Sequence, residues 1–505
     1  MEIGARQALT ARLPRTVFLL CMAVEGLSLL GYLVPGVRLA VFALLAALAL
    51  ALALTDLRWL FALLMVEMIV GAHGRLFWAD VHGFGLSLRM VLFAILVLGW
   101  FVHAMRGCSR IMHFRHAHVT APLLLLLVAI TLAATRGLSE GASLGMIFGD
   151  ANGYAFLLLI PIGLDLFAGR EAFAWLTRPL AGALAWLAAK SLFLLYFFSH
   201  DFGLLMTDVF RWQRSFGLSE MTRLGGGAVR IFSASDVFLI PAVFLGALLA
   251  WAYGRRKILL WTVLAVAAFL LSLSRSFWLG AVVAAAFMLP VFVRKEIVPL
   301  RRIGKFFGTV LVALGLAVGA LAFLTLFPFP DRLTDAGGWN AYRGRFTDAG
   351  DAAVSSRWNM LPHLKAGIAR APILGSGFGA TITYRSDDPR IIDLYPPDGI
   401  ITTGAIEWQY LEIWLKMGLL GVLAVVWLWW RIGLFFWRTI GTARGTDRLL
   451  AAGLMLSFLA FIIANIFTPY INHPLGWGFL TLVIIGLHAA QEQEPPEHAE
   501  RPRLV

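Results

Sequence analysis

Apolar segments long enough to cross a lipid bilayer follow one another along almost the whole of this 505-residue chain. A transmembrane helix needs about 20 mainly apolar residues, and charged or turn residues mark where each segment ends. By this criterion the expected spans lie near residues 17–34, 37–54, 57–73, 84–104, 119–135, 153–168, 179–198, 231–252, 258–273, 276–293, 306–327, 405–430, 449–470 and 474–490.

The composition agrees with a chain that lies mostly in the membrane. Hydrophobic residues make up 60% of it and charged residues 14%, whereas a soluble domain is about half apolar and about one quarter charged. The apolar content excludes a disordered chain. Two cysteines are too few for a disulfide scaffold, and a soluble enzyme is excluded as well.

The sequence therefore predicts an all-α polytopic membrane protein with about 14 transmembrane helices, within a range of about 12 to 14. Residues 1–327 and 405–490 form its membrane parts. Between them, residues 328–404 form a large, partly helical loop, and a loop of about 75 residues is usually functional. The polar tail 491–505 is expected to be disordered.

Basic residues gather in alternate loops, and this sets the expected orientation. With the N-terminus inside, every dense cluster of Lys and Arg falls on the inner side, as the positive-inside rule requires. Both termini are then cytoplasmic, and the loop 328–404 lies outside. The net charge of +13 thus reflects topology, and nucleic acid is not an expected partner. The clusters lie near residues 106–115, 170–178, 255–257, 294–305 and 431–448.

Arg275 stands apart because no other Asp, Glu, Lys or Arg lies between Ile258 and Val293. It occupies a short break between two expected spans. A guanidinium group stays charged and binds phosphate oxygens in bidentate fashion, so Arg275 is a candidate anion contact. The alternative is an interfacial arginine that extends to the outer surface.

Arg357 lies in the large loop, in a stretch with helical spacing. Ser355 or Ser356 is expected to cap this helix, which Pro372 ends. Arg357 would then lie in the first turn, where free backbone N–H groups add positive potential for an anion. A solvated helix arginine is the alternative.

Glu407 opens the span after the loop. It has no partner one helical turn away, unlike Glu412, which is expected to pair with Lys416. Glu407 is therefore a candidate general base, or else a plain interfacial carboxylate. His363 is a second candidate base, although a single histidine on a helix face is more often structural.

The glycine run within Ile373–Ala380 is expected to form a tight backbone turn, because it lacks the lysine of a P-loop and the strand that precedes a dinucleotide-binding turn.

The order of these features resembles the superfamily of O-antigen ligases and O-antigen polymerases. An "SR" entry into a span is followed by a large external loop with R-W-x-x-L and then by a Y-L helix that ends in G-hydrophobic-hydrophobic-G. The segments that carry the resemblance are Arg230–Gly246, Leu271–Phe287, Arg357–Leu361, Ala371–Gly379 and Tyr410–Gly421.

The resemblance implies a glycosyltransferase of the bacterial inner membrane, acting at the periplasmic face. It would transfer a glycan from undecaprenyl diphosphate to a glycan or to the lipid A–core, with no nucleotide sugar, cofactor or metal. The family's paired arginines would fall on Arg275 and Arg357, which agrees with the anion argument, and Arg230 is a secondary candidate. A chain-length regulator or other envelope-polysaccharide machinery is a candidate partner.

One departure from the family pattern concerns the choice between ligase and polymerase. In the ligases a histidine precedes the Y-L helix, in an H-N-x-Y-L pattern, whereas Glu407 stands here. This favours slightly an O-antigen polymerase, or a relative that makes an exopolysaccharide.

Two other functions remain open: a transporter or flippase for the same lipid-linked glycan, and a scaffold without activity. A transporter should carry charges in mid-span, and we expect few of these, namely Glu25, Glu67 and Arg89.

Overall fold

The computed structural model describes residues 2–107, 118–167, 169–334, 338, 340–342, 344, 352–387, 392 and 399–491. In this part of the chain, 12 helices are long and apolar enough to cross a membrane. The prediction of an all-α polytopic membrane protein is thus confirmed, at the lower end of the expected range. Residues 492–505 of the expected tail lie outside the described residues.

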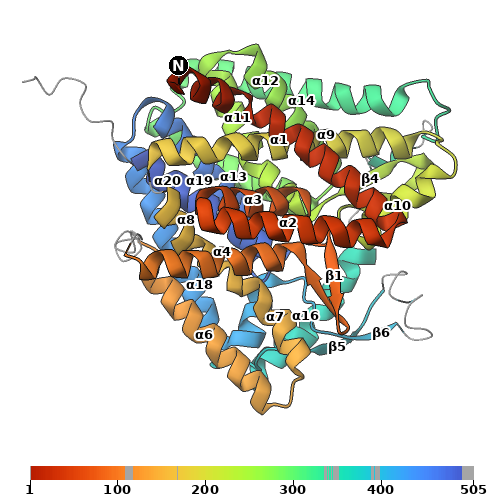
Figure 1. Cartoon of the computed structure of the whole chain (residues 1–505), viewed down its shortest axis with the longest axis vertical. Helices are drawn as coiled ribbons and strands as arrows, with labels where there is room; N and C mark the ends of the chain where they lie inside the picture. Colours follow the sequence, from red (N-terminus) through yellow and green to blue (C-terminus); the bar gives the residue numbers. More distant parts are fainter. Residues whose placement is uncertain are drawn as a thin grey trace, which may run out of the picture.

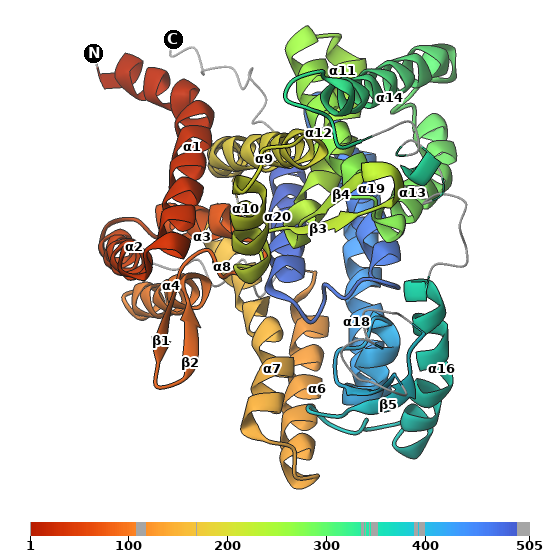
Figure 2. The ribbon, with the colours of Figure 1, turned by 90° about the vertical axis from the view of Figure 1, so that its right-hand side faces the viewer.

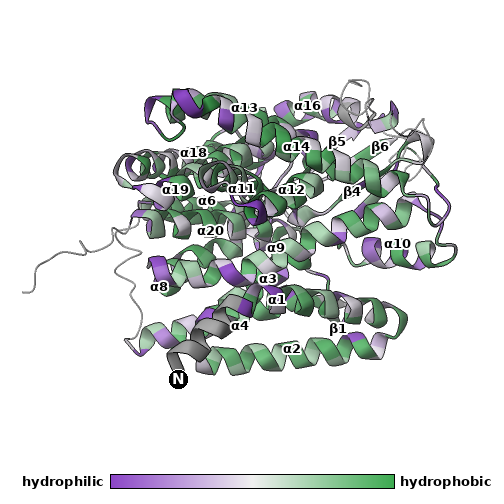
Figure 3. Ribbon diagram, turned by 90° about the horizontal axis from the view of Figure 1, so that it is seen from above, coloured by the Kyte–Doolittle hydropathy of each residue, from purple (hydrophilic) through white to green (hydrophobic). Residues whose placement is uncertain are grey.

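The membrane-crossing helices form one large bundle (Figure 1), in which α1 packs against α9 and α13 against α19. Figure 3 shows that most of their length is apolar. Helices α7 and α8, with the short η1 (Phe156–Leu158), make one crossing, as do η3 (Ala234–Phe238) and α11. The bounds are α1 Glu2–Leu33, α2 Pro35–Thr55, α4 Leu88–Met105, α6 Thr120–Ser139, α7 Leu144–Ala155, α8 Leu159–Phe167, α9 Arg170–Ser199, α11 Leu239–Tyr253, α13 Arg275–Arg294, α14 Ile303–Leu326, α18 Gln409–Thr442, α19 Gly445–Ala464 and α20 Pro474–Gln491.

Two of the expected spans form helices that are shorter than a full crossing. Helix α3 (Leu57–Val70) has 14 residues and α12 (Arg256–Leu271) has 16. At about 1.5 Å per residue, each helix is shorter than the roughly 30 Å of a bilayer's apolar core, and the non-helical residues that follow it complete the path to β1 or to the contact with β4.

Three β-hairpins, which the sequence did not predict, lie at one end of the bundle. Figures 1 and 3 place them together on the right, and Figure 2 shows that end face-on. The middle hairpin turns at Gly225–Gly227, where Gly226 and Gly227 have φ of 63° and 70°. Two further helices lie at this end, α10 (Leu205–Ser215) and α16 (Ala352–Arg370). The hairpins pair β1 Trp78–Val81 with β2 Phe84–Ser87, β3 Glu220–Arg223 with β4 Val229–Phe232, and β5 Ile382–Arg385 with β6 Ile400–Thr403, all antiparallel.

Two ion pairs lie inside the bundle. Arg89 lies 2.7 Å from Glu67, and Lys190 lies 3.0 Å from Glu25. The expectation of few mid-span charges missed Lys190, which is buried in the middle of α9. Pairing is what makes such charges tolerable in an apolar interior.

Helix α18 is interrupted at Gly418, whose φ of 65° and ψ of −166° are not helical. The break leaves carbonyl groups without helical partners, and the turn at 371–379 supplies donors. The N–H of Ser376 donates to the Leu415 carbonyl (2.6 Å) and that of Gly377 to the Lys416 carbonyl (3.1 Å). In return, the Leu419 N–H donates to the Pro372 carbonyl (3.0 Å).

The glycines of this turn are required by its geometry, which confirms the expected tight turn. Gly375, Gly377 and Gly379 have φ of 72°, 85° and 85°, a region that side chains disfavour. A Cβ on Gly375 would lie 2.4 Å from the backbone nitrogen of Gly418. The loop and the broken helix therefore meet backbone to backbone.

We expect Gly418→Ala to destabilise the protein by about 2 kcal/mol or more, because it combines an unfavourable φ with a Cβ placed 2.2 Å from the Ile373 carbonyl oxygen. Gly433→Ala is the matched control: it lies in the same helix, and its Cβ would have nothing within 4 Å. Thermal unfolding of the purified protein in detergent measures both. Equal melting temperatures for the two variants would contradict this role of the break.

Candidate functional site

Arg357 and Glu407 form an ion pair across 50 residues of sequence. Arg357 lies on α16, and its Nε donates to Oε2 of Glu407, which stands just before the N-cap residue of α18, Trp408. Their side chains are 34% and 48% exposed. The structure thus brings together a candidate anion contact and the candidate base.

The predicted cap of the Arg357 helix is wrong. Helix α16 begins at Ala352, because the alanines before the serines are strong helix formers and extend it. The hydroxyl of Ser355 instead donates to Asp387 (3.0 Å), and that of Ser356 shares a hydrogen bond with Ser386 (2.7 Å). Arg357 therefore lies in the second turn, away from the free N–H groups.

Arg275, and not Arg357, is the candidate arginine that lies at the start of a helix. It is the first residue of α13 and follows the short break after α12, where Leu273 has a φ of 47°. An anion here would meet the guanidinium group and the free N–H groups of the first helical turn. Arg230, on β4, donates from Nε to the Ser272 carbonyl (2.8 Å) in the same break.

The connection between α19 and α20 links the two arginine regions. On one side Ser276, next to Arg275, shares a hydrogen bond of 2.7 Å with Thr468. On the other side the ring of Phe467 lies 5.3 Å from that of Trp408. Trp408 in turn donates from Nε1 to the carbonyl of Arg357 (3.0 Å). Phe467 and Thr468 thus stand between the elements that carry Arg275 and Arg357.

His363 does not share the position of the other candidates. Its side chain is exposed, and it follows Arg357 by six residues. At about 100° per residue this places it on a different face of α16.

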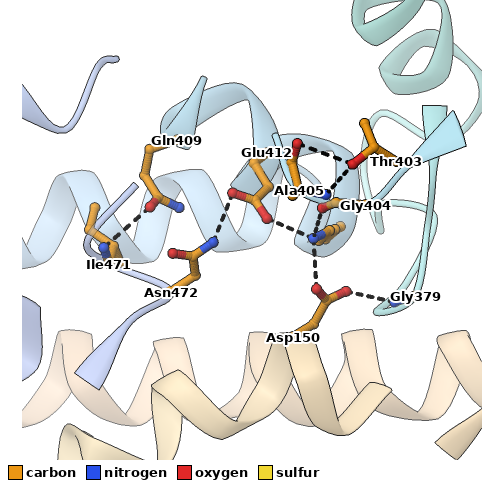
Figure 4. A network of polar contacts seen from close by, with 10 residues as sticks. Asp150, Gly379, Thr403, Gly404, Ala405, Gln409, Glu412, Ile471 and Asn472 are labelled. Atoms are coloured by element: carbon orange, nitrogen blue, oxygen red, sulfur yellow. Dashed lines mark hydrogen bonds and ion pairs between the residues drawn. The ribbon is translucent and has the colours of Figure 1, made fainter. Parts of the chain in front are cut away.

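A buried ion cluster lies in the first turns of α18, shortly after Glu407 in the sequence (Figure 4). Lys416 donates to Glu412 (2.6 Å), to Asp150 (2.8 Å) and to the Gly404 carbonyl (2.8 Å). The Glu412–Lys416 pair expected from the sequence is confirmed, and both side chains are only 4% exposed.

The same cluster reaches three other parts of the chain. Asp150 on α7 accepts a hydrogen bond from the Gly379 N–H (2.7 Å), and Glu412 accepts one from Asn472 (3.0 Å). Gln409 accepts one from the Ile471 N–H (3.2 Å). The sequence had shown Asp150 and Asn472 only as isolated polar residues at the ends of apolar runs, with no signal of a shared partner.

The two ion pairs differ in strength because they differ in exposure. An exposed pair contributes about 0–1 kcal/mol, whereas removing one member of a buried pair costs about 3–5 kcal/mol. The Arg357–Glu407 pair can therefore separate at little cost, whereas breaking the Lys416 cluster would cost several times more.

Replacing Lys416 with Met should lower the free energy of unfolding by about 3–5 kcal/mol, because Glu412 would remain buried without its cation. Lys365→Met, on the exposed face of α16, is the control and should have little effect. Chemical or thermal unfolding in detergent compares the variants. A Lys416 variant as stable as the Lys365 variant would show that the cluster does not hold the loop.

Comparison with known families finds a related domain in this chain. The family model described as O-antigen ligase matches residues 260–426, a region that holds Arg275, Arg357 and Glu407 but not Arg230. A search of curated proteins finds no match. Together with the many membrane-crossing helices, the family match confirms the resemblance over part of the sequence: this is a multi-pass membrane protein in which residues 260–426 are similar to the O-antigen ligase family.

Proposed function

We propose that this protein is a glycosyltransferase that moves an oligosaccharide or polysaccharide from undecaprenyl diphosphate to an acceptor glycan at the periplasmic face of the inner membrane. The ion pair between Arg357 and Glu407 carries the proposal, because it joins a phosphate-binding group to a carboxylate that can accept a proton. Glu407 in the place of the ligases' histidine favours a polymerase over a ligase.

The diphosphate of the donor would lie between Arg275 and Arg357, with Arg230 as a further contact. Support comes from the position of Arg275 at the start of α13, where helix and guanidinium act together. Phe467 and Thr468, between the two regions, would form part of the site's floor.

Donor binding would free Glu407. A diphosphate carries more negative charge than one carboxylate and offers more oxygens to a guanidinium fork. Because the exposed ion pair contributes at most about 1 kcal/mol, Arg357 can exchange Glu407 for the diphosphate. The base would thus become available only when the donor is in place.

The transfer itself would be an inverting displacement. An acceptor hydroxyl oxygen forms a bond to the anomeric carbon, and the bond from that carbon to the diphosphate oxygen breaks. Glu407 takes the hydroxyl proton, and the arginines stabilise the charge that develops on the leaving undecaprenyl diphosphate. His363 is the fallback base, with the weaker geometric support.

The positions of the hairpins support the proposed orientation. All three hairpins and α16 of the large loop lie at one end of the bundle (Figures 1 and 2), and Arg230 on β4 donates to the α12–α13 break. We place that end in the periplasm and the basic loops and termini in the cytoplasm. A chain-length regulator or other envelope machinery would meet the protein at the periplasmic end.

Purified protein incubated with a lipid-linked repeat unit should lengthen the glycan and release undecaprenyl diphosphate. Arg275→Ala and Arg357→Ala should each slow this by about 100-fold or more, the usual effect of removing a group that stabilises developing charge. Arg370→Ala, exposed at the end of α16, is the control and should keep the wild-type rate.

Full activity in Arg357→Ala would sink the proposed exchange. Movement of the lipid-linked unit from one leaflet of a vesicle membrane to the other, without chain growth, would instead indicate a flippase. A wild-type protein with neither activity would indicate a scaffold.

A further inference from the structure

Trp358 presents a large aromatic side chain to solvent beside the candidate site. It lies on α16, next to Arg357, and is 57% exposed. The other exposed tryptophans of the described residues lie on α3, α12 and α18 within the apolar bundle, where exposed apolar surface is expected to meet lipid. Those residues are Trp59, Trp261, Trp427, Trp430 and Trp437.

The indole of Trp358 is held in place by its neighbour. Its ring lies 5.4 Å from that of Trp408, at an interplanar angle of 66°, a favourable edge contact. Trp408 is itself fixed by its hydrogen bond to the Arg357 carbonyl. Trp358 is thus adjacent to Arg357 in sequence and in ring contact with the residue that follows Glu407.

Polar residues lie close to Trp358 in the sequence of α16. Ser355 and Asn359 both donate to Oδ2 of Asp387, at 3.0 and 2.6 Å. They lie three residues before and one after Trp358, so Ser355 and Trp358 share a helix face. An exposed aromatic face beside an amide, a hydroxyl and a carboxylate matches a pyranose ring, which has an apolar C–H face and hydroxyls along its edge.

We infer that Trp358, with Asn359 and Asp387, forms a subsite that binds one sugar of the acceptor glycan. The inference rests on the proposed function. The sugar is assigned to the acceptor because the ring contact leads to Trp408 and Glu407, the proposed base, whereas the donor's diphosphate belongs to the arginines. A stacked acceptor sugar would hold its hydroxyl near Glu407 and reduce the entropy cost of the displacement.

The subsite can be tested on the full-length protein by two separate measurements. The first is the Kd of the repeat-unit oligosaccharide released from its lipid, measured by calorimetry in detergent. The second is the rate of transfer with the lipid-linked repeat unit. Trp358→Ala should weaken oligosaccharide binding by about tenfold, the range of a good aromatic contact, and Trp358→Phe should keep most of the affinity.

Binding of undecaprenyl diphosphate should be unchanged in both Trp358 variants. Trp261→Ala is the matched control, because Trp261 is 56% exposed on α12 and should affect neither ligand. Thermal unfolding checks that Trp358→Ala is folded, and Trp358→Phe keeps the test valid if it is not.

The results distinguish failure of the Trp358 subsite from failure of the proposed glycosyltransferase function. Wild-type affinity for the oligosaccharide in Trp358→Ala, or no binding by the wild-type protein, would overturn the subsite while leaving transfer intact. A wild-type protein that binds the oligosaccharide but transfers nothing would overturn the proposed function alone. Weaker quenching of the total tryptophan fluorescence by brominated lipid in Trp358→Phe than in the wild-type protein, with unchanged oligosaccharide binding in the Ala variant, would assign Trp358 to the membrane surface and overturn the subsite.

Discussion

The backbone of α18 cannot hydrogen-bond to itself where Gly418 interrupts it, and the glycine turn at 371–379 supplies the missing partners. In an apolar environment an unpaired backbone group costs several kcal/mol, so loop and helix must fold together. The Lys416 cluster strengthens the same junction by joining α7, the glycine turn, the end of β6 and the connection before α20. Everything proposed for Arg357 and Glu407 depends on this junction, because it fixes α16 against the start of α18.

Behind this rigid junction the candidate site has an interaction that can change. The ion pair of Arg357 with Glu407 is open to solvent, while the Lys416 pair is closed to it. In the proposed exchange, the diphosphate of the donor would replace Glu407 at Arg357. The order of events would then be donor binding, release of the carboxylate and activation of the acceptor. The same exchange would also keep Glu407 paired with Arg357 until the donor binds, so that no free base is present before that step.

The apolar pattern predicted nearly all the helices, because each span is a local property of about 20 residues. Ion pairs between residues close in sequence, such as Glu412 and Lys416, could be predicted equally well. The contacts that shape the site could not be predicted, because the partners of Asp150, Asn472 and Thr468 are distant in the sequence. The α16 start was misplaced because serine's capping preference competed with the helix propensity of the preceding alanines. The apolar pattern did not reveal that the helical parts of the segments near 57–73 and 258–273 are only 14 and 16 residues long, because apolar length in sequence does not show where a turn ends a helix.

The exchange of partners at Arg357 is the central claim, and one binding measurement tests it directly. Undecaprenyl diphosphate has no sugar to transfer, so its Kd for the wild-type protein and for Glu407→Gln can be measured without turnover. If Glu407 competes with the diphosphate for Arg357, the variant should bind up to about fivefold more tightly while losing transfer activity. An equal or weaker affinity in Glu407→Gln would contradict the account.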